Sequence, residues 1–577
     1  MKSPRALALA AAAVVAAVAV AAVAQPGAAG PVEARFASAR TTVEQPAPAA
    51  PAALPTHYTV LLAEDADRAA AEAAVTAAGG RVLRENAAIE ALVVEGPQSG
   101  FIEAVAASEA VFGAATARPV GRTAAAVGQG SSAAPGHAAQ GPAGLDPLDA
   151  QLWGLAMIGA DAARATEPGD RGVHVGILDS GIDASHPDLA ANVDLALSRN
   201  FVTDIPVDPN GVVLDGPCEF EGCVDPAGHD GSGHGTHVAG TVAAAANGFG
   251  LSGVAPNVTL VNIRAGQDGG LLFLQPVVDA LTYGADIGLD VINMSFYVDP
   301  WLYNCLDNPA DSPAARIEQR TTIEAMRRAL TYAHEAGVTL VGSLGNNHED
   351  LGKPRADASS PNYPSQSAYQ RPTDNRTCVT LPAEGPHVIG VSAVGPSGIK
   401  AAYSNYGTEQ ISLAAPGGYL RDGAGTPSFG TPGNLILSTY PQHVLQAAGD
   451  VDAAGEVTQQ GAQKGIQRAC GAGGCGYYAY LQGTSMAAPH VTGVAALVVS
   501  RFGTPDPERP GTLAMPPDAV EEILLAAATE RACPAPVVSY TDVGLPAEFD
   551  APCEGTPEFN GHYGAGIVNA AAAVAAR

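Results

Sequence analysis

From about residue 146 onward, short apolar runs alternate with longer segments in which apolar residues recur every three or four positions. The short runs suit strands that are buried on both faces, and the longer segments suit helices with an apolar face. Strands that alternate with helices form parallel sheets with helices on both faces, so the pattern predicts an α/β fold around a mostly parallel central sheet. The predicted strands are 173–178, 258–263, 291–294 and 338–343, and the predicted helices are 236–245, 274–284, 321–336 and 486–501.

A second, smaller pattern lies nearer the N-terminus, over residues 57–120. The spacing of its apolar residues indicates a strand, a helix, two strands and a second helix in that order, which predicts a small α+β domain. The expected strands are 57–62, 81–84 and 89–94, and the expected helices are 68–78 and 101–111.

Three segments lack such a pattern and predict no folded structure of their own. Residues 1–24 carry Lys2 and Arg5 before an Ala/Val-rich run that ends in small residues, which is typical of a secretory signal peptide. A retained membrane anchor is the alternative, but alanine is weakly apolar and no second hydrophobic span follows. Residues 25–56 are rich in Ala and Pro and residues 121–145 in Ala, Gly, Ser and Gln, so both are predicted linkers. We therefore expect a secreted, extracellular protein with its last domain over 146–577.

Composition narrows the class of partner. The 577 residues are 47% hydrophobic and carry a formal net charge of −29. The apolar fraction is sufficient for a large core, and the length predicts at least two domains. A strongly acidic surface repels nucleic acid and anionic membranes, so neither is an expected partner once the signal peptide is removed. We expect a monomer.

Eight cysteines, all beyond residue 210, fit an exported protein. An even number in a secreted chain indicates disulfides, although eight cysteines allow 105 pairings. A zinc site is the alternative, but neither Cys-x-x-Cys pairs nor clustered histidines accompany them. The pairing that we predict is 218–223, 305–378, 470–475 and 533–553.

Four short motifs contain the side chains needed for nucleophilic attack on a carbonyl. Asp179 and Asn346 directly follow two predicted strands, where functional residues of parallel sheets gather, and Ser485 begins a predicted helix. Taken alone, each has an ordinary explanation, because Asp and Asn form turns and Ser caps helices. The motifs are GILDSGID with Asp179, GSGHGTHVAG with His234, GSLGNN with Asn346 and LQGTSMAAPHVTG with Ser485.

In this order the four motifs resemble those of the subtilisin-like serine peptidases, peptidase family S8. The resemblance implies that Ser485 is the nucleophile, His234 its general base and Asp179 the group that orients the imidazole, with Asn346 as oxyanion donor. Spacing alone does not choose between His234 and His237. The resemblance assigns the first histidine and leaves His237 as a core residue.

The N-terminal pattern resembles, more loosely, the inhibitory propeptide of the same family, with an unrelated small α+β domain as the alternative. A propeptide implies a zymogen in which the 57–120 domain inhibits the enzyme intramolecularly. The closing segment 562–570 resembles the usual end of the peptidase domain, and we expect no appended domain after it.

The resemblance also implies a calcium site. Asp188 matches the ligating aspartate of the family and Asn247 its ligating loop, and a surface loop with a capping aspartate is the alternative. Carbonyl oxygens would complete the all-oxygen shell that calcium prefers. They are those of Ala245, Phe249 and Leu251.

The expected substrate cleft departs from the family pattern. Where the family has Ser-Leu-Gly-Gly, this chain has Ser295-Phe296-Tyr297-Val298, followed by an insertion that extends to about Arg320. Two further insertions cover about 347–377 and 441–476. We expect a narrowed cleft and a changed preference, without selection for Lys or Arg. The candidate substrate-binding residues are Ser295, Phe296, Tyr297, Gly345 and Thr380.

The sequence therefore predicts a secreted serine endopeptidase that acts on proteins or peptides. One alternative is a processing enzyme dedicated to a single peptide partner. The other is a binding protein on an inactive scaffold, which four intact motifs disfavour.

Overall fold

The computed structural model describes residues 56–119, 146–471 and 473–576. The predicted signal peptide and linkers lie outside the described residues, apart from Thr56, which begins the first strand.

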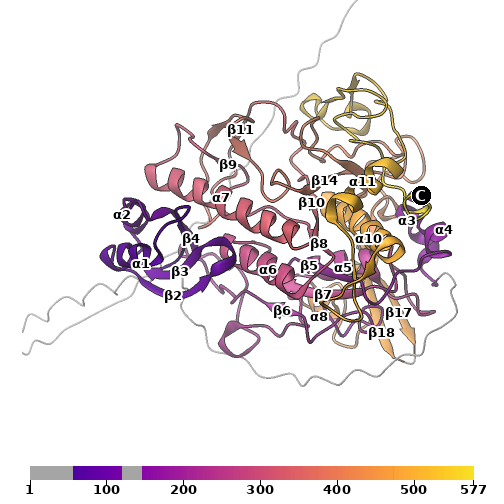
Figure 1. Ribbon diagram of the computed structural model, residues 1–577. Coiled ribbons are helices and arrows are strands. Elements are labelled where there is room, and N and C mark those ends of the chain that lie inside the picture. Colours follow the sequence, from indigo (N-terminus) through magenta and orange to yellow (C-terminus); the bar gives the residue numbers. More distant parts are fainter. Residues whose placement is uncertain (1–55, 120–145, 472, 577) are drawn as a thin grey trace, which may run out of the picture. The chain divides into compact units, whose positions relative to one another are not determined.

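A seven-stranded sheet forms the centre of the larger domain, in the order β15-β14-β10-β8-β5-β7-β6 (Figure 1). Every neighbouring pair in it is parallel, so the predicted fold class is confirmed. Its strands are β5 His174–Leu178, β6 Arg199–Asn200, β7 Thr259–Arg264, β8 Val291–Met294, β10 Thr339–Ser343, β14 Val388–Val394 and β15 Leu413–Pro416.

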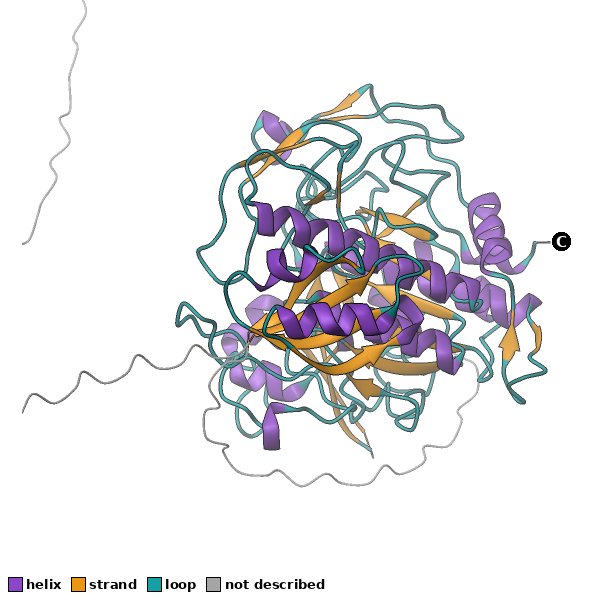
Figure 2. Ribbon diagram, turned by 60° about the vertical axis from the view of Figure 1, so that its left-hand side comes forward, coloured by secondary structure: helices purple, strands orange, loops and turns teal. Residues whose placement is uncertain are grey.

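Two apolar cores cover the two faces of this sheet. Successive residues of one strand enter different cores, as the alternation of side chains in a strand requires: Val291 joins one and Ile292 the other. The first core contains residues of α5 His234–Ala243 and α10 Thr484–Phe502, and the second contains residues of α6 Leu274–Ile287 and α7 Pro313–Glu335. Figure 2 shows the helices lying across the strands.

The predicted helix 321–336 begins eight residues earlier than expected. Ser312 accepts a hydrogen bond from the Ala315 N–H, and Pro313 occupies the first helical turn, where its missing N–H is not needed. The segment that we assigned to an insertion up to Arg320 therefore contributes the first two turns of α7.

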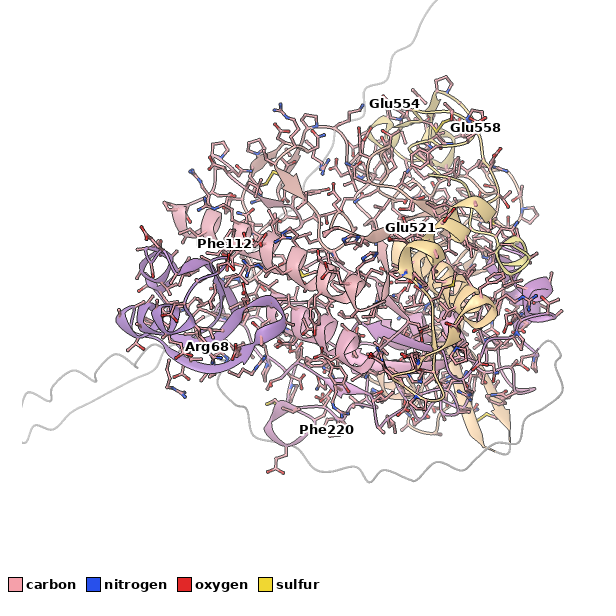
Figure 3. The ribbon with its side chains drawn as sticks, in the orientation of Figure 1. Arg68, Phe112, Phe220, Glu521, Glu554 and Glu558 are labelled. Carbon is pink, nitrogen blue, oxygen red and sulfur yellow. A yellow bond between two sulfur atoms is a disulfide. The ribbon has the colours of Figure 1, made fainter. Side chains whose placement is uncertain are left out.

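The N-terminal domain is a four-stranded antiparallel sheet, in the order β2-β3-β1-β4, with two helices. The predicted helix 101–111 is too long, because the chain turns after Ala106 and Val111 begins β4, a strand that we did not predict. The domain has its own core around Val60, Val94 and Phe101. Figure 3 labels Phe112 on β4, whose side chain is 45% exposed. The elements are β1 Thr56–Leu62, α1 Arg68–Ala77, β2 Arg81–Asn86, β3 Ala91–Gly96, α2 Phe101–Ala106 and β4 Val111–Pro119.

Shorter elements surround the central sheet. Three helices, α3 Trp153–Met157, α4 Ala160–Arg164 and α12 Ala570–Val574, lie near the ends of the larger domain, and α11 Pro517–Ala527 follows α10. The region 436–481 forms β16 Ile436–Tyr440, α8 Gln442–Ala447, α9 Gln459–Lys464, β17 Gln467–Gly471 and β18 Gly474–Leu481. Four two-stranded pairs complete the fold: β9 Asn304–Cys305 with β13 Cys378–Val379, β11 Arg355–Asp357 with β12 Arg371–Thr373, β19 Thr504–Pro505 with β20 Leu513–Ala514, and β21 Val537–Val538 with β22 Ala551–Pro552.

All four predicted disulfides are confirmed: 218–223, 305–378, 470–475 and 533–553. Among the helices of the described residues, none combines the length and the apolar character that crossing a membrane requires.

Candidate active site

Asp179 and His234 meet where β5 ends and α5 begins. Asp179 is the residue after β5 and is buried, and His234 is the first residue of α5. The Nδ1 atom of His234 lies 2.7 Å from Oδ1 of Asp179, a distance typical of a charge-assisted hydrogen bond. Two motifs 55 residues apart in the sequence are therefore in direct contact.

The surroundings of His234 favour its protonated form. Burial lowers the pKa of the imidazole, but the charge and the hydrogen bond of Asp179, with a further contribution from Asp230, raise it above its ordinary value. The side chain is 34% exposed, so the ring is accessible from the cleft.

His237 lies one helical turn further along α5 and has a different environment. It is fully buried, and its Nε2 atom lies 3.0 Å from the carbonyl oxygen of Ile436. Burial, together with the nearby His234, lowers its pKa to about 3. His237 therefore stays neutral and supports the core, in agreement with our expectation.

Ser485 is the second residue of α10 and lies at the N-terminal end of that helix. Its Oγ donates a hydrogen bond to the carbonyl oxygen of Ser295 at 3.1 Å, and in the described residues it makes no hydrogen bond to His234. A hydrogen bond from this hydroxyl to His234 would therefore require it to turn away from Ser295. Both side chains line the same cleft, so this rotation is a local change.

Asn346 is held by a residue that the sequence analysis did not single out. Its Oδ1 accepts hydrogen bonds from the N–H of Thr484 at 2.9 Å and from the Thr484 hydroxyl at 3.0 Å. The same hydroxyl also accepts a hydrogen bond from the N–H of Gly345. With the carbonyl end of its amide anchored, the exposed Asn346 has its Nδ2 donor available at the cleft. The sequence feature that could have pointed to Thr484 is its position directly before Ser485.

Asp230 is a second residue that the sequence analysis missed. Its buried carboxylate accepts hydrogen bonds from the N–H groups of Ser232, Gly233 and Thr236 and from the hydroxyl of Ser180. It therefore satisfies the free N–H groups at the start of α5 and ties them to the residue after Asp179. The sequence feature that could have pointed to Asp230 is its position four residues before His234, near the start of a predicted helix.

The cleft has a free volume of about 380 Å³. All five candidate substrate-binding residues line it: Ser295, Phe296, Tyr297, Gly345 and Thr380. Three further residues that line the cleft, which we did not predict, are Gly270, Leu271 and Leu272, just before α6. The backbone segments 270–272 and 295–297 therefore both border the cleft.

The five predicted calcium ligands lie close together. Asp188 is fully buried, and its carboxylate accepts hydrogen bonds from the Leu251 N–H at 3.1 Å and the Tyr478 hydroxyl at 2.8 Å. The Asn247 amide lies 3.1 Å from the other carboxylate oxygen. Burial raises the pKa of Asp188 to about 7. Within the described part of the chain, no N–H or O–H donates to the carbonyl oxygens of Ala245, Phe249 or Leu251.

A group of carboxylates that the sequence analysis did not identify lies elsewhere. Oxygen atoms of Asp204, Glu219 and Asp268 come within 4.8 Å of one another. Asp204 and Asp268 both accept hydrogen bonds from the buried Arg264. Burial and the neighbouring carboxylates raise the pKa of Asp204 to about 8. These residues are far apart in the sequence, so no local pattern predicts the group.

The family model for the subtilase family matches residues 170–566, which is more than half of the chain. The chain belongs to the subtilase family. This subtilase is therefore a serine peptidase, a hydrolase. The match includes all four motifs of the site, from Asp179 to Ser485.

Curated relatives and solved structures agree with this assignment. The subtilase is 28% identical to subtilisin DY of Bacillus licheniformis over 352 residues, which cover 61% of this chain and 85% of that one. It is 29% identical to fervidolysin of Fervidobacterium pennivorans, over 63% of this chain and 39% of that one. The epidermin leader peptide processing serine protease of Staphylococcus aureus has a similar fold, with a TM-score of 0.58 at 19% identity, over 90% of this chain and 98% of that one.

Proposed function

We propose that this subtilase is a secreted serine endopeptidase made as a zymogen, with Asp179, His234 and Ser485 as its catalytic triad. The observation that carries the proposal is the 2.7 Å contact between Asp179 and His234 on the wall of the cleft that Ser485 also lines. The expected substrate is a protein or peptide.

In the proposed reaction, Nε2 of His234 takes the proton of the Ser485 hydroxyl while Oγ attacks the carbonyl carbon of the scissile peptide bond. The tetrahedral intermediate collapses, the C–N bond breaks, and His234 gives its proton to the leaving amine. Water, activated by the same imidazole, then hydrolyses the acyl-enzyme. Throughout, Asp179 keeps the Nδ1 proton in place and stabilises the imidazolium.

The oxyanion would receive two hydrogen bonds, from the Nδ2 atom of Asn346 and the backbone N–H of Ser485. The second donor lies at the N-terminus of α10, where free N–H groups and the helix dipole favour negative charge.

Replacing Asn346 by leucine tests this assignment. We expect kcat for a peptide substrate to fall by about 10² to 10³, a range carried over from the oxyanion-hole asparagine of subtilisin, with little change in KM. The effect falls on kcat because the donor acts mainly on charge that develops in the transition state. Asn210→Leu, at an exposed site outside the cleft, is the matched control. Equal kcat values for the two variants would contradict the assignment.

The N-terminal domain is proposed to be the inhibitory propeptide. It contacts α6 and α7 through several polar pairs: Thr59 donates to Gln275, Asn86 donates to Asp279, and Arg84 forms an ion pair with Asp279. In the same contact Arg328 of α7 donates to the backbone carbonyl of Leu62. These contacts support intramolecular binding before cleavage between this domain and the peptidase domain.

We also propose a structural calcium ion held by Asp188 and Asn247 with the carbonyls of Ala245, Phe249 and Leu251. The fit rests on a fully buried carboxylate beside a loop in which three carbonyl oxygens receive no hydrogen bond from the described residues. A second buried carboxylate, that of Asp146, accepts hydrogen bonds from the same loop and adds negative charge. A bound cation would offset the cost of burying these charges.

Calcium is therefore expected to raise the melting temperature. In the Ser485→Ala background, which avoids self-digestion, calcium at about 100 times its Kd should raise Tm by about 3 °C relative to EDTA, as measured by calorimetry. Asp188→Asn should abolish this difference, whereas Asp307→Asn, at a site 76% exposed, should keep it. A Tm unaffected by calcium would mean that Tyr478 and the loop amides satisfy Asp188 without an ion.

A further inference from the structure

One side of the cleft forms a subsite next to Ser485. Its two walls are the segments 295–297 and 343–347, and Thr380 lies among its lining residues. The other side chains that line it include Tyr297, Leu302 and Leu344. This subsite is the place for the side chain of the residue whose carbonyl Ser485 attacks, because Ser295 and Asn346, one on each wall, flank that serine.

Tyr297 lines this subsite. Its ring packs against a core cluster that contains Leu302, Leu344 and Ala383, and Leu344 belongs to the opposite wall. Directly beyond it, the N–H of Val298 donates to the carbonyl oxygen of Leu381 at 2.8 Å. This hydrogen bond joins the residue after Tyr297 to the residue after Thr380. Tyr297 therefore lies directly before the point at which these two segments are joined.

The second insertion holds Tyr297 in this position. Nδ2 of Asn362 lies 3.0 Å from the Tyr297 hydroxyl and 2.6 Å from Oδ1 of Asp299. The other oxygen of Asp299 accepts a hydrogen bond from the N–H of Leu272, on the facing wall of the cleft. Asn362 and Asp299 thus connect Tyr297 to both sides of the cleft.

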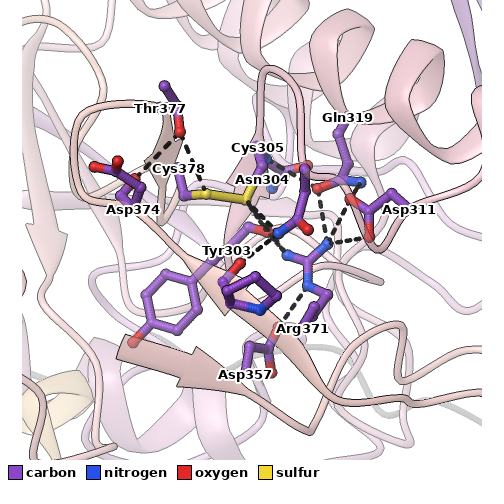
Figure 4. Close-up of a disulfide and its surroundings, with 12 residues drawn as sticks. Tyr303, Asn304, Cys305, Asp311, Gln319, Asp357, Arg371, Asp374, Thr377 and Cys378 are labelled. Atoms are coloured by element: carbon purple, nitrogen blue, oxygen red, sulfur yellow. Dashed lines mark hydrogen bonds and ion pairs between the residues drawn. A yellow bond between two sulfur atoms is a disulfide. The ribbon is translucent and has the colours of Figure 1, made fainter. Parts of the chain in front are cut away.

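The insertion is itself rigidly supported (Figure 4). The disulfide between Cys305 and Cys378 closes its base. The buried guanidinium of Arg371 forms ion pairs with Asp311 and Asp357 and lies over the ring of Trp301. Because Asn362 belongs to this braced segment, Tyr297 cannot leave the subsite without losing its hydrogen bond to Asn362 or displacing the segment.

We propose that Tyr297, positioned by Asn362, limits this subsite to small uncharged side chains, those of Gly, Ala and Ser, at the residue on the acyl side of the scissile bond. The proposal rests on the proposed function. A larger side chain would have to displace the tyrosine ring. A lysine or arginine would be buried without a free partner, because among the described residues one carboxylate lines this side of the cleft, that of Asp299, and both of its oxygens already accept hydrogen bonds.

Chromogenic peptides that differ only at this residue test the proposal. For the wild type, kcat/KM should be about 10 to 100 times higher with Ala than with Phe or Arg. Tyr297→Gly should raise kcat/KM for the Phe peptide at least about tenfold and remove the preference. Asn362→Ala should give a smaller gain for Phe than Tyr297→Gly does. Tyr297→Phe keeps the ring but loses the same hydrogen bond, so its gain for Phe should be no larger than that of Asn362→Ala.

Labelling of Ser485 by a sulfonyl fluoride, measured for each variant, separates the possible failures. A labelled Tyr297→Gly enzyme whose Ala/Phe ratio equals that of the wild type overturns the proposal, and so does a wild type that prefers Phe or Arg. A wild type that neither cuts a peptide nor reacts at Ser485 overturns the proposed function itself. If Tyr297→Gly does not fold, Tyr297→Ala and Asn362→Ala provide the same comparison.

Discussion

Replacing Ser485 by alanine is expected to lower kcat for peptide hydrolysis by about 10⁶, a magnitude carried over from the nucleophile of subtilisin. The loss is large because alanine removes the atom that forms the acyl-enzyme, and the remaining groups then have nothing to activate. In the same experiment, intact mass and N-terminal sequencing of secreted protein should reveal loss of the segment before about Asp146 in the wild type only.

Ser500→Ala is the matched control, since Ser500 lies on the same helix but outside the cleft, where its hydroxyl donates to the Ala496 carbonyl and accepts from the Asp170 N–H. It should mature and cut peptides as the wild type does. If wild type and Ser485→Ala both stay full length, and neither cuts peptides, the chain is an inactive scaffold. If both are trimmed alike, another protease carries out maturation, and peptide hydrolysis then decides the role of Ser485.

Asp179→Asn should have the second largest effect, a fall in kcat of about 10⁴, a magnitude carried over from the same Asp-to-Asn change in a Ser-His-Asp triad. An amide in this position can hold the imidazole in the wrong tautomer, with its proton on the nitrogen that must accept one from Ser485. It also removes the negative charge that stabilises the imidazolium.

The same variant should change the pH profile. The active enzyme requires neutral His234, so activity is lost as the pH falls through the pKa of this imidazole. Asp179 raises that pKa, and its replacement should therefore move the acid limb of kcat/KM to lower pH. Asp183→Asn, on the same loop but hydrogen-bonded to Ser185, should leave the limb in place. An unmoved limb in Asp179→Asn would mean that another group controls it.

Much of this protein follows from local pattern. Apolar runs such as 291–294 and 338–343 became buried strands because both faces of a covered parallel sheet require apolar residues. Asp179 and Asn346 follow such strands, and the carboxyl ends of parallel strands share one edge of the sheet, so their proximity to one site was predictable. The disulfides 218–223 and 470–475 were predictable from sequence separation, since five residues favour local pairing.

Other features depend on contacts between distant segments. Local pattern missed β4, which pairs with β1 across about 50 residues, and it placed the start of α7 too late, because Ser312 and Pro313 lie in a segment without apolar periodicity. Thr484 anchors Asn346 from 138 residues away, and Asp230 bridges the ends of β5 and α5.

The sequence by itself determined the family and the fold class and predicted which side chains react, because each depends on residue types within short motifs or on local periodicity. Only the tertiary structure decided which histidine contacts Asp179 and how far the cleft is open beside Ser485. Both depend on contacts between side chains of separate loops, such as the hydrogen bond between Asn362 and Tyr297, which are 65 residues apart. Such contacts produce no repeating pattern of residue types in the sequence, because a single hydrogen bond constrains only the two residues that form it.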